Sequence, residues 1–211
     1  MLILADDRTL PILEGAKRAF AEKGFDGASM QDLARAADMS AGNFYRYFPS
    51  KNAIIEAIIA QDLATIKADF LKIMESPHPL VDLTAAFQTR IDDMRCSNDG
   101  PLWAEIDAAA ARRPEIAEKV RAMEAVVHGY LLSVFARLSG LSAEIASERF
   151  SGHAAFLVLL FKAATHQPAQ KDCQMPEQLR NDLRGLILTT IARTLGDVTQ
   201  PSTLNIIEKT I

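Results

Sequence analysis

The sequence lacks the features that mark secreted and membrane proteins. Its two cysteines, Cys96 and Cys173, allow one disulfide bond but no disulfide framework, and we expect both thiols to be reduced. The longest apolar run, residues 154–161, is much shorter than the roughly 20 residues that cross a bilayer. The N-terminal residues carry no basic segment of the kind that opens a signal peptide. The sequence therefore predicts a cytoplasmic protein without a membrane span.

An excess of positive charge is also lacking. The chain has 23 lysines and arginines against 27 aspartates and glutamates, which gives a formal net charge of −4. Any binding to nucleic acid must therefore come from a local patch rather than from a global basic field. Even residues 1–60 hold seven basic and eight acidic side chains, so a dimer is needed to double the phosphate contacts.

Motifs for catalysis and for metal or cofactor binding are missing. The chain has no Walker loop, no GxGxxG and no GxSxG sequence. Its four histidines are scattered, without the spacing to cysteine or carboxylate that a metal site needs. The acidic pairs Asp92-Asp93 and Glu105/Asp107 fall on expected helices, where we predict solvent-exposed faces rather than a shared proton site. The sequence thus predicts no enzyme and no bound metal or cofactor.

What the sequence does contain is helical periodicity between widely spaced prolines. Residues 115–167 have no proline, and no turn dipeptide between alternating apolar runs indicates a β-hairpin. The predicted fold class is therefore all-α, with segments 97–101 and 166–176 as loops and 196–211 as a tail. Helices are expected near residues 9–23, 29–36, 40–47, 50–75, 79–96, 101–112, 114–139, 142–166 and 176–195.

The first three expected helices form the pattern of a helix-turn-helix. Gly24 ends the first helix, because glycine readily leaves the helical conformation. Ser29, with Asp32 three residues later, forms a capping-box pattern at the start of the second helix, and Ser40 caps the third. Two short helices joined by a tight turn are typical of a motif whose second helix enters the major groove of DNA.

Side chains near the start of the third helix are suited to approaching bases. Ala41 and Gly42 are small, so the backbone can come close to DNA. The amide of Asn43 offers both a donor and an acceptor, which suits a base edge. These three residues are therefore predicted to face the bases.

Residues further along are suited to phosphate. The hydroxyl groups of Tyr45 and Tyr47 can reach phosphate oxygens, and Arg46 adds a positive charge beside them. Lys51 stands at the start of the next helix, where free N–H groups already favour an anion. We therefore predict that Lys51 contacts a phosphate. A partly buried Tyr45 is the structural alternative.

The whole N-terminal pattern resembles one family. Residues 12–58 are similar to the DNA-binding domain of the TetR family of bacterial transcriptional regulators. The resemblance implies a helix-turn-helix domain over residues 1–50 and a larger helical domain over residues 51–211 that binds an effector and dimerises. The matching residues are Ile12, Leu13, Ala16, Phe20, Gly24, Phe25, residues 29–34, Ala37, Met39, Ser40, Gly42, Phe44, Tyr45, Phe48, Ser50 and Lys51.

The resemblance also implies contacts from the second helix, and it has two departures. Ser29, Met30 and Gln31 would touch phosphates or base edges, although a serine cap and a core methionine are the structural alternatives. The family usually has glycine where Asp38 stands, and aspartate tolerates the left-handed backbone of such a turn better than most residues. The family usually has histidine where Tyr47 stands, so any positive charge at that position is lost.

The rest of the chain predicts a helical bundle whose apolar faces first of all form a core. The resemblance implies that this region encloses a pocket for a small, usually apolar effector. Aromatic and polar residues on the expected bundle helices are candidates to line it, with core packing as the alternative. They are Phe87, Met94, Trp103, His128, Tyr130 and Phe135.

The last two expected helices, near 142–166 and 176–195, are apolar on all sides over residues 154–161 and 185–192. A helix that is apolar on every side is buried on every side, and a second subunit would supply the cover. By resemblance, these helices form a four-helix interface in a homodimer.

Together these features favour a homodimeric, ligand-responsive repressor. Its two recognition helices would enter successive major grooves, about 34–36 Å apart, on a near-palindromic double-stranded operator. Two alternatives stay open: a helical small-molecule-binding protein or enzyme with a vestigial DNA-binding head, and a regulator that binds DNA constitutively or acts through a protein partner.

Overall fold

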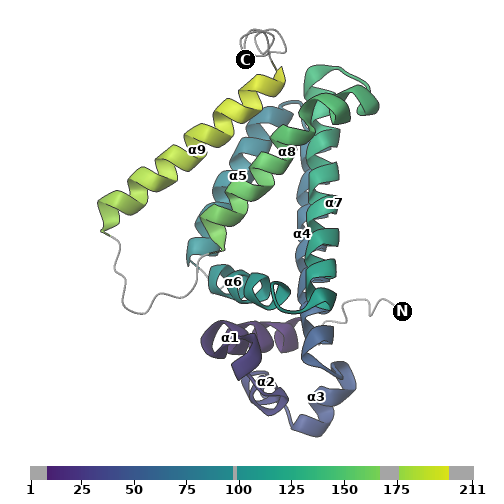
Figure 1. Cartoon of the computed structure of the whole chain (residues 1–211), viewed down its shortest axis with the longest axis vertical. Coiled ribbons are helices and arrows are strands. Elements are labelled where there is room, and N and C mark those ends of the chain that lie inside the picture. The colour runs from purple at the N-terminus through teal and green to yellow at the C-terminus, as the bar shows by residue number, and fades with distance from the viewer. Residues whose placement is uncertain (1–8, 97–98, 167–175, 200–211) are drawn as a thin grey trace. The chain divides into compact units, whose positions relative to one another are not determined.

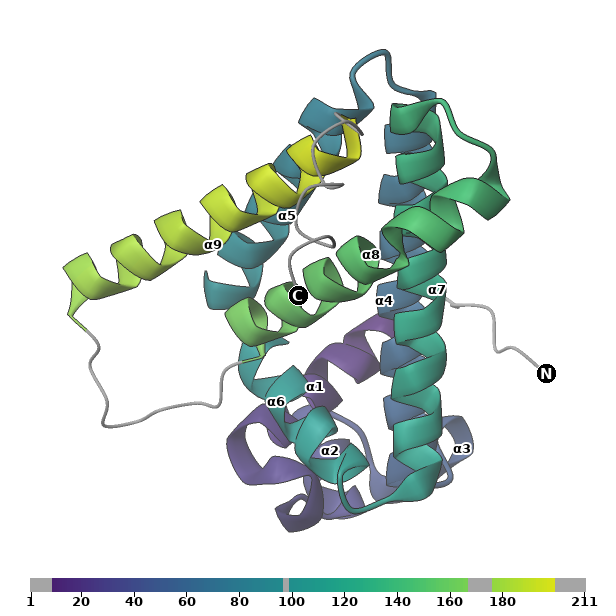
Figure 2. The same ribbon diagram turned by 45° about the horizontal axis from the view of Figure 1, so that its top comes forward.

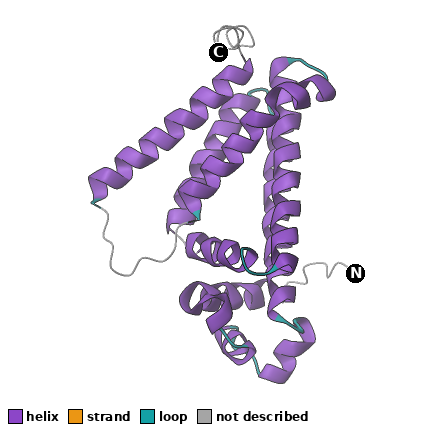
Figure 3. Ribbon diagram, viewed as in Figure 1, coloured by secondary structure: helices purple, strands orange, loops and turns teal. Residues whose placement is uncertain are grey.

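The computed structural model describes residues 9–96, 99–166 and 176–199, and within these ranges every regular element is an α-helix (Figures 1 and 3). The predicted all-α fold is confirmed, and the described helices follow the predicted order. They are α1 (Thr9–Gly27), α2 (Met30–Ala36), α3 (Ala41–Tyr47), α4 (Lys51–Glu75), α5 (Pro79–Cys96), α6 (Asp99–Ala110), α7 (Pro114–Ser139), α8 (Ala143–Thr165) and α9 (Glu177–Thr199).

Both boundaries of α6 and the end of α9 differ from the expectation. Helix α9 continues through Gly196 to Thr199, into the segment predicted as a tail, because a glycine inside a helix lowers its stability without ending it. Helix α6 begins at Asp99, inside the segment predicted as a loop, and Pro101 lies in its first turn. Proline is tolerated there, since the first N–H groups of a helix have no intrahelical partner. The helix also ends at Ala110, so Arg112 and Arg113 lie in the turn that follows rather than on the helix.

The described residues form two compact units that are interleaved along the chain. We call residues 9–65, 92–123 (without 97–98) and 165–166 the head unit, and residues 66–91, 124–164 and 176–199 the bundle unit. Helices α4 and α7 each contribute their first part to the head unit and their last part to the bundle unit. The predicted domain division at residue 50 stays a prediction.

In the head unit, α1 packs against both α2 and α6, as Figures 1 and 2 show. The apolar face of α1 is buried, and the ring of Phe20 stacks on that of Phe25 at 5.5 Å between centroids. Gly15 allows the end of α2 to approach, because a Cβ atom there would lie 2.5 Å from the carbonyl oxygen of Ala36. The facing side of α6 is buried too and contributes Leu102, Trp103, Ile106 and Ala109.

The bundle unit has its own core, in which Phe135 of α7 meets Phe150 of α8 edge to face at 6.2 Å. Arg137 joins the end of α4 to α7 within this unit. Its guanidinium group donates to the carbonyl oxygens of Ile73, Met74 and Ser76 at 3.0, 2.6 and 2.5 Å. The first two carbonyls lie in the last turn of α4 and the third directly follows the helix, where carbonyl groups have no partner inside the helix, so Arg137 acts as its C-terminal cap.

No single helix in the described ranges has both the length and the hydropathy needed to cross a membrane. The bent pair of α7 and α8 meets the criteria of length and composition only when its two helices are taken together.

Candidate DNA-binding site

The turn between α1 and α2 sets the start of the helix-turn-helix. Gly24 has φ 74° and ψ 162°, which breaks the helical path as predicted, so that Phe25 turns into the core. Ser29 then caps α2. Its hydroxyl accepts from the N–H of Asp32 at 3.1 Å, and the Asp32 carboxylate accepts from the N–H of Ser29 at 3.0 Å. The predicted capping box is confirmed.

Asp32 is a charged centre of this turn. The ammonium group of Lys23 lies 2.5 Å from one carboxylate oxygen. This contact, followed by the hydroxyl and N–H groups of Ser29, holds the pKa of Asp32 well below its ordinary value. The carboxylate is therefore ionised over the whole physiological range, and α2 keeps a negative group near its N-terminus.

The turn between α2 and α3 has the backbone that the sequence predicts. Asp38 has φ 54°, which is the left-handed conformation expected at this position, and the N–H of Met39 donates to the carbonyl oxygen of Ala34. Ser40 caps α3 and accepts from the N–H of Asn43 at 3.4 Å. The helix-turn-helix therefore forms from these local signals.

Helix α3 has one buried side. Phe44 and Phe48 are buried, with ring centroids 5.9 Å apart, and they fix which side of the helix faces the protein. The remaining residues therefore point away from the core. Gly42, Asn43, Tyr45 and Arg46 are exposed, and Ala41 and Tyr47 are half-buried. On α2, Gln31 is exposed and Met30 is half-buried.

Three of the predicted DNA contacts already have partners inside the protein. Ser29 and Ser40 accept the hydrogen bonds that cap α2 and α3. Lys51 donates from its ammonium group to the carbonyl oxygens of Phe25, Asp26 and Ala28 at 2.6, 3.4 and 3.1 Å. The contacts of all eleven predicted residues with DNA stay predictions. Ser29, Ser40 and Lys51 differ from the rest because their side chains already make hydrogen bonds within the protein.

A group of charged residues that the sequence reasoning missed surrounds the end of α1. Glu105 of α6 accepts from the N–H of Phe25 at 3.3 Å. Asp26 lies 2.9 Å from Arg112 and 2.6 Å from Arg113, both in the turn after α6. The hydrogen bonds from Arg113 and then Arg112 lower the pKa of Asp26 below its ordinary value.

The prediction that Glu105 and Asp107 form a solvent-exposed acidic face is therefore wrong. The carboxylate of Asp107 accepts a hydrogen bond from Nδ1 of His166 at 2.7 Å. The His166 ring stacks on Trp103 with centroids 5.5 Å apart. Both carboxylates are used inside the head unit. The sequence holds only a weak signal for these contacts. Gly24 and the two arginines before Pro114 indicate turns, but they do not indicate which residues the turns contact.

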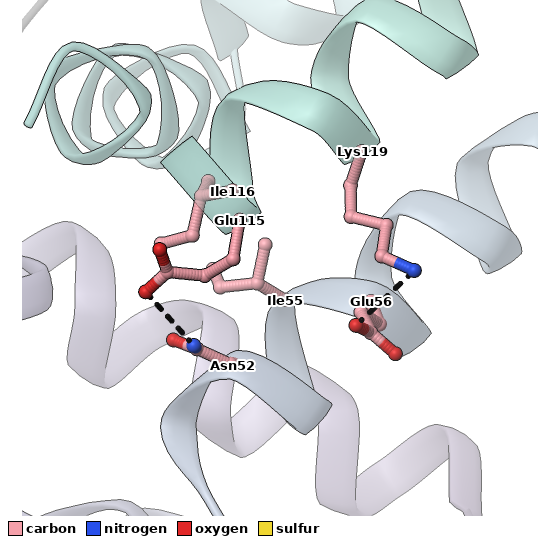
Figure 4. Close-up of a pocket in the computed structure, with 6 residues that line it drawn as sticks. All are labelled: Asn52, Ile55, Glu56, Glu115, Ile116 and Lys119. Carbon is pink, nitrogen blue, oxygen red and sulfur yellow. Dashed lines mark hydrogen bonds and ion pairs between the residues drawn. The ribbon is translucent and has the colours of Figure 1, made fainter. Parts of the chain in front are cut away.

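Figure 4 shows a surface depression of the head unit between α4 and α7, whose polar groups are paired. The amide of Asn52 donates to Glu115 at 3.4 Å, and Lys119 lies 3.4 Å from Glu56. The floor is formed by Ile55 and by Ile116, which are buried. Within the described residues, no three His, Cys, Asp or Glu side chains are grouped to hold a metal ion.

The structure does not place the predicted effector-lining residues in one unit. Trp103 belongs to the head unit, where it is buried against His166. In the bundle unit, Phe135 is fully buried, whereas three others are half-buried beside a neighbouring side chain: Phe87 by Phe161, His128 by Ser151 and Tyr130 by Phe70. The side chain of Met94 lies outside the described residues. Their contact with an effector stays a prediction.

Two helices of the bundle unit expose large apolar side chains. On α8, Phe156 and Leu159 are 43% and 67% exposed, and on α9, Leu183 and Leu186 are 40% and 65% exposed. The same helices bury Leu157 and Ile191 in the core of the chain. Each helix thus has one side in the core and a second apolar side without cover in the single chain.

Comparison with known proteins identifies the family. Residues 12–58 match the family model described as bacterial regulatory proteins, tetR family. The transcriptional repressor Rv1474c of Mycobacterium tuberculosis is 31% identical over 158 residues, which are 66% of this chain and 83% of Rv1474c. The chain belongs to the TetR family. The HTH-type transcriptional regulator UidR of Escherichia coli K12 is 34% identical over 118 residues, which are 52% of this chain and 55% of UidR. This match spans about half the length of UidR.

Solved structures extend the likeness beyond the N-terminal helices. GusR of Salmonella enterica has a TM-score of 0.59 and 25% identity, and the match covers 91% of this chain and 98% of GusR. The regulator FadR of Bacillus subtilis, solved in complex with stearoyl-CoA, has a TM-score of 0.56 and 16% identity, with 91% and 98% covered. The second likeness concerns the fold alone.

Proposed function

We propose that this TetR-family protein is a cytoplasmic transcriptional regulator that binds a near-palindromic DNA operator. The observation that carries the proposal is the division of α3 into a buried aromatic side and a polar exposed side. Phe44 and Phe48 hold the helix on the head unit, and Gly42, Asn43 and Tyr45 are left exposed. This is the arrangement that a recognition helix needs to enter the major groove. We propose no enzymatic activity.

The proposed DNA contacts divide by chemistry. Asn43 reads a base edge, because its amide can donate and accept at once. Gln31, Tyr45, Arg46 and Tyr47 contribute hydrogen bonds or charge around it, and their contacts position the head on the duplex. Ala41 and Gly42 let the backbone approach. The small size of Gly42 matters for DNA rather than for folding, since a Cβ atom there would meet nothing within 4 Å.

The proposed operator-binding form is a homodimer through α8 and α9. The exposed apolar side chains of these helices support this, because each helix carries a pair three residues apart, on one side of the helix: Phe156 with Leu159 and Leu183 with Leu186. Exposed apolar patches mark interaction sites. A single head carries few free cations, and two heads double the phosphate contacts and fix the spacing of two half-sites. The dimer therefore solves the problem set by the near-neutral charge of the head.

We further propose that a small, apolar effector binds in the bundle unit and releases the operator. Half-buried aromatic pairs lie between helices there, Phe70 with Tyr130 at 5.3 Å and Phe87 with Phe161 at 6.1 Å. Aromatic side chains of this kind predominate in the lining of sites for small apolar ligands. The effector must bind the conformer with low operator affinity more tightly than the other, or it shifts nothing. The protein is then a repressor.

The experiment that tests the proposal is selection of DNA fragments by the purified protein, followed by sequencing. Enrichment of one near-palindrome supports a specific regulator, and the genes beside it indicate the effector class. A folded dimer that enriches no sequence at low salt contradicts the proposal, and the bundle unit then becomes the site of the protein's activity.

A further inference from the structure

The ammonium group of Lys51 is surrounded by acceptors. It lies 2.6, 3.4 and 3.1 Å from the carbonyl oxygens of Phe25, Asp26 and Ala28 and 4.8 Å from the centroid of the Phe25 ring. An ammonium group has three N–H donors, and here each has an acceptor. A phosphate oxygen can reach this group only by displacing one of these carbonyls.

The acceptors themselves explain why a cation is held there. Phe25 and Asp26 lie in the single turn between the break at Gly24 and the end of α1 at Gly27, and Ala28 follows that end. Their carbonyl groups therefore have no partner inside a continuing helix. The ring of Phe25 adds a second attraction, because its face is electron-rich. Lys51 therefore satisfies carbonyl groups that would otherwise be partly buried without a donor.

The position of these partners along the chain is informative. Residues 25–28 lead into α2, and Lys51 is the first residue of α4, directly after the turn that follows α3. The contact therefore joins the two ends of the helix-turn-helix, residues 29–50, which lie between them. Closing such a loop restricts the orientations that α2 and α3 can adopt before DNA arrives.

We propose that Lys51 is a clasp that closes the helix-turn-helix and positions α3, rather than a phosphate contact. The clasp is the set of contacts between the Lys51 ammonium group and the carbonyls and ring of residues 25–28. The contact of Lys51 is independent of the proposed DNA-binding function. Its expected effect on DNA binding rests on that function. It replaces the phosphate role that the sequence predicts for this lysine.

The test compares Lys51→Met with Arg46→Met and Lys67→Met. Methionine keeps most of the apolar length of the lysine side chain and removes the charge. Arg46 is exposed in the last turn of α3 and serves as the reference for a phosphate contact, and Lys67 is exposed on α4 in the bundle unit and controls for net charge. Each protein binds a fluorescent duplex selected by the wild type and a scrambled duplex, over a series of salt concentrations.

The clasp predicts that Lys51→Met binds the selected duplex about tenfold more weakly, discriminates less against the scrambled duplex and keeps the wild-type salt slope. Arg46→Met should reduce that slope by about 2 for the dimer, because each lost phosphate contact lowers it by about 0.9. Binding is measured well below the melting temperature, so loss of stability alone leaves the affinity unchanged. A slope reduced by about 2 in Lys51→Met overturns the clasp, as does unchanged discrimination.

Two measurements on the DNA-free protein keep the inference separate from the proposed function. Lys51→Met should lower the melting temperature by about 5 °C, because hydrogen bonds to a charged group are lost. It should also speed amide exchange in residues 25–33, whereas Lys67→Met changes neither. If the wild type binds no DNA, the proposed function fails, and these two measurements still decide the clasp. Unchanged exchange and melting temperature overturn it.

Discussion

Arg113 and Asp26 form an ion pair of 2.6 Å between the turn that follows α6 and the end of α1. The guanidinium group of Arg112 lies 2.9 Å from the second oxygen of the same carboxylate, so that Asp26, Arg112 and Arg113 form one charged cluster. Glu105 binds the neighbouring N–H of Phe25 from α6 itself. The end of α1 is therefore joined to α6 through charge as well as through the apolar contact of the two helices.

This cluster predicts a pH-dependent effect of Asp26→Asn. The pKa of Asp26 is lowered in the folded protein, so the ion pairs add stability that is complete above the unfolded value of about 3.9 and is lost as pH falls through the lower folded value. At pH 7 the substitution should reduce the melting temperature by only about 2 °C, because the groups are exposed. The difference from the wild type should shrink below about pH 4.

A thermal scan at a series of pH values checks this, with Glu22→Gln as the control for a lost negative charge on α1. Glu22 is exposed on the same helix. A difference between Asp26→Asn and the wild type that persists unchanged at pH 2 contradicts the ion-pair account.

Gly42→Ala should separate folding from DNA binding. A Cβ atom at this position meets nothing within 4 Å, and alanine is the better helix former, so stability should rise by about 0.5 kcal/mol. Operator affinity should fall at the same time, because the methyl group would lie where we propose that the backbone approaches the bases. Gly129→Ala, on an exposed part of α7 with equally open space, should leave operator affinity unchanged. Undiminished affinity of Gly42→Ala would remove the close approach from the model of binding.

Asn43→Ala should change which operators are preferred rather than weaken binding uniformly. A bidentate contact with one base contributes about 1–3 kcal/mol of discrimination, so preference at one position of each half-site should relax by that amount. Selection from a randomised operator library with wild type and variant measures it. An equal loss on every sequence would show that Asn43 supports the helix and reads no base.

Leu159→Glu on α8 or Leu186→Glu on α9 should separate the proposed dimer into monomers. Each side chain is about two-thirds exposed in the single chain, at 67% and 65%, and a buried carboxylate in an apolar interface is strongly unfavourable. Val81→Glu on α5 is the matched control, since Val81 is 64% exposed in the same unit and lies outside the proposed interface. Light scattering at micromolar concentration should find monomers for the first two variants and dimers for the control. A monomeric wild type contradicts the two-half-site operator.

The parts of the site that could be predicted are those set by near neighbours. Ser29 and Asp32 are three residues apart, and Asp38 lies in a turn whose conformation depends on its own backbone, so local rules suffice. The existence and order of the helices were likewise predictable, because caps, glycines and prolines mark most of their ends, although α9 continues through Gly196 to Thr199. Pro101 misled the prediction only because proline is equally acceptable in a first turn and in a loop.

The parts that could not be predicted join residues far apart in sequence. Glu105 binds Phe25 across 80 positions, and Arg112 and Arg113 bind Asp26 across 86 and 87. An acidic residue that faces water and one that accepts a distant N–H look the same in a helical pattern, because periodicity reports which side of a helix is apolar and not what lies opposite the polar side. Trp103 shows the same limit, since its aromatic character suits an effector pocket and a stack on His166 equally well.

The acceptors of the clasp are all main-chain oxygens, and this has an evolutionary consequence. A substitution at position 26 or 28 changes a side chain and leaves the carbonyl group in place, so neither can remove the hydrogen bond that its residue makes to Lys51. Substitutions at these two positions therefore leave their hydrogen bonds to Lys51 in place. A substitution of Lys51, by contrast, cannot be compensated by a side-chain change at either position. In a saturation mutagenesis of the head unit, position 51 should be intolerant, and no covariation of position 51 with position 26 or 28 should reveal that they touch.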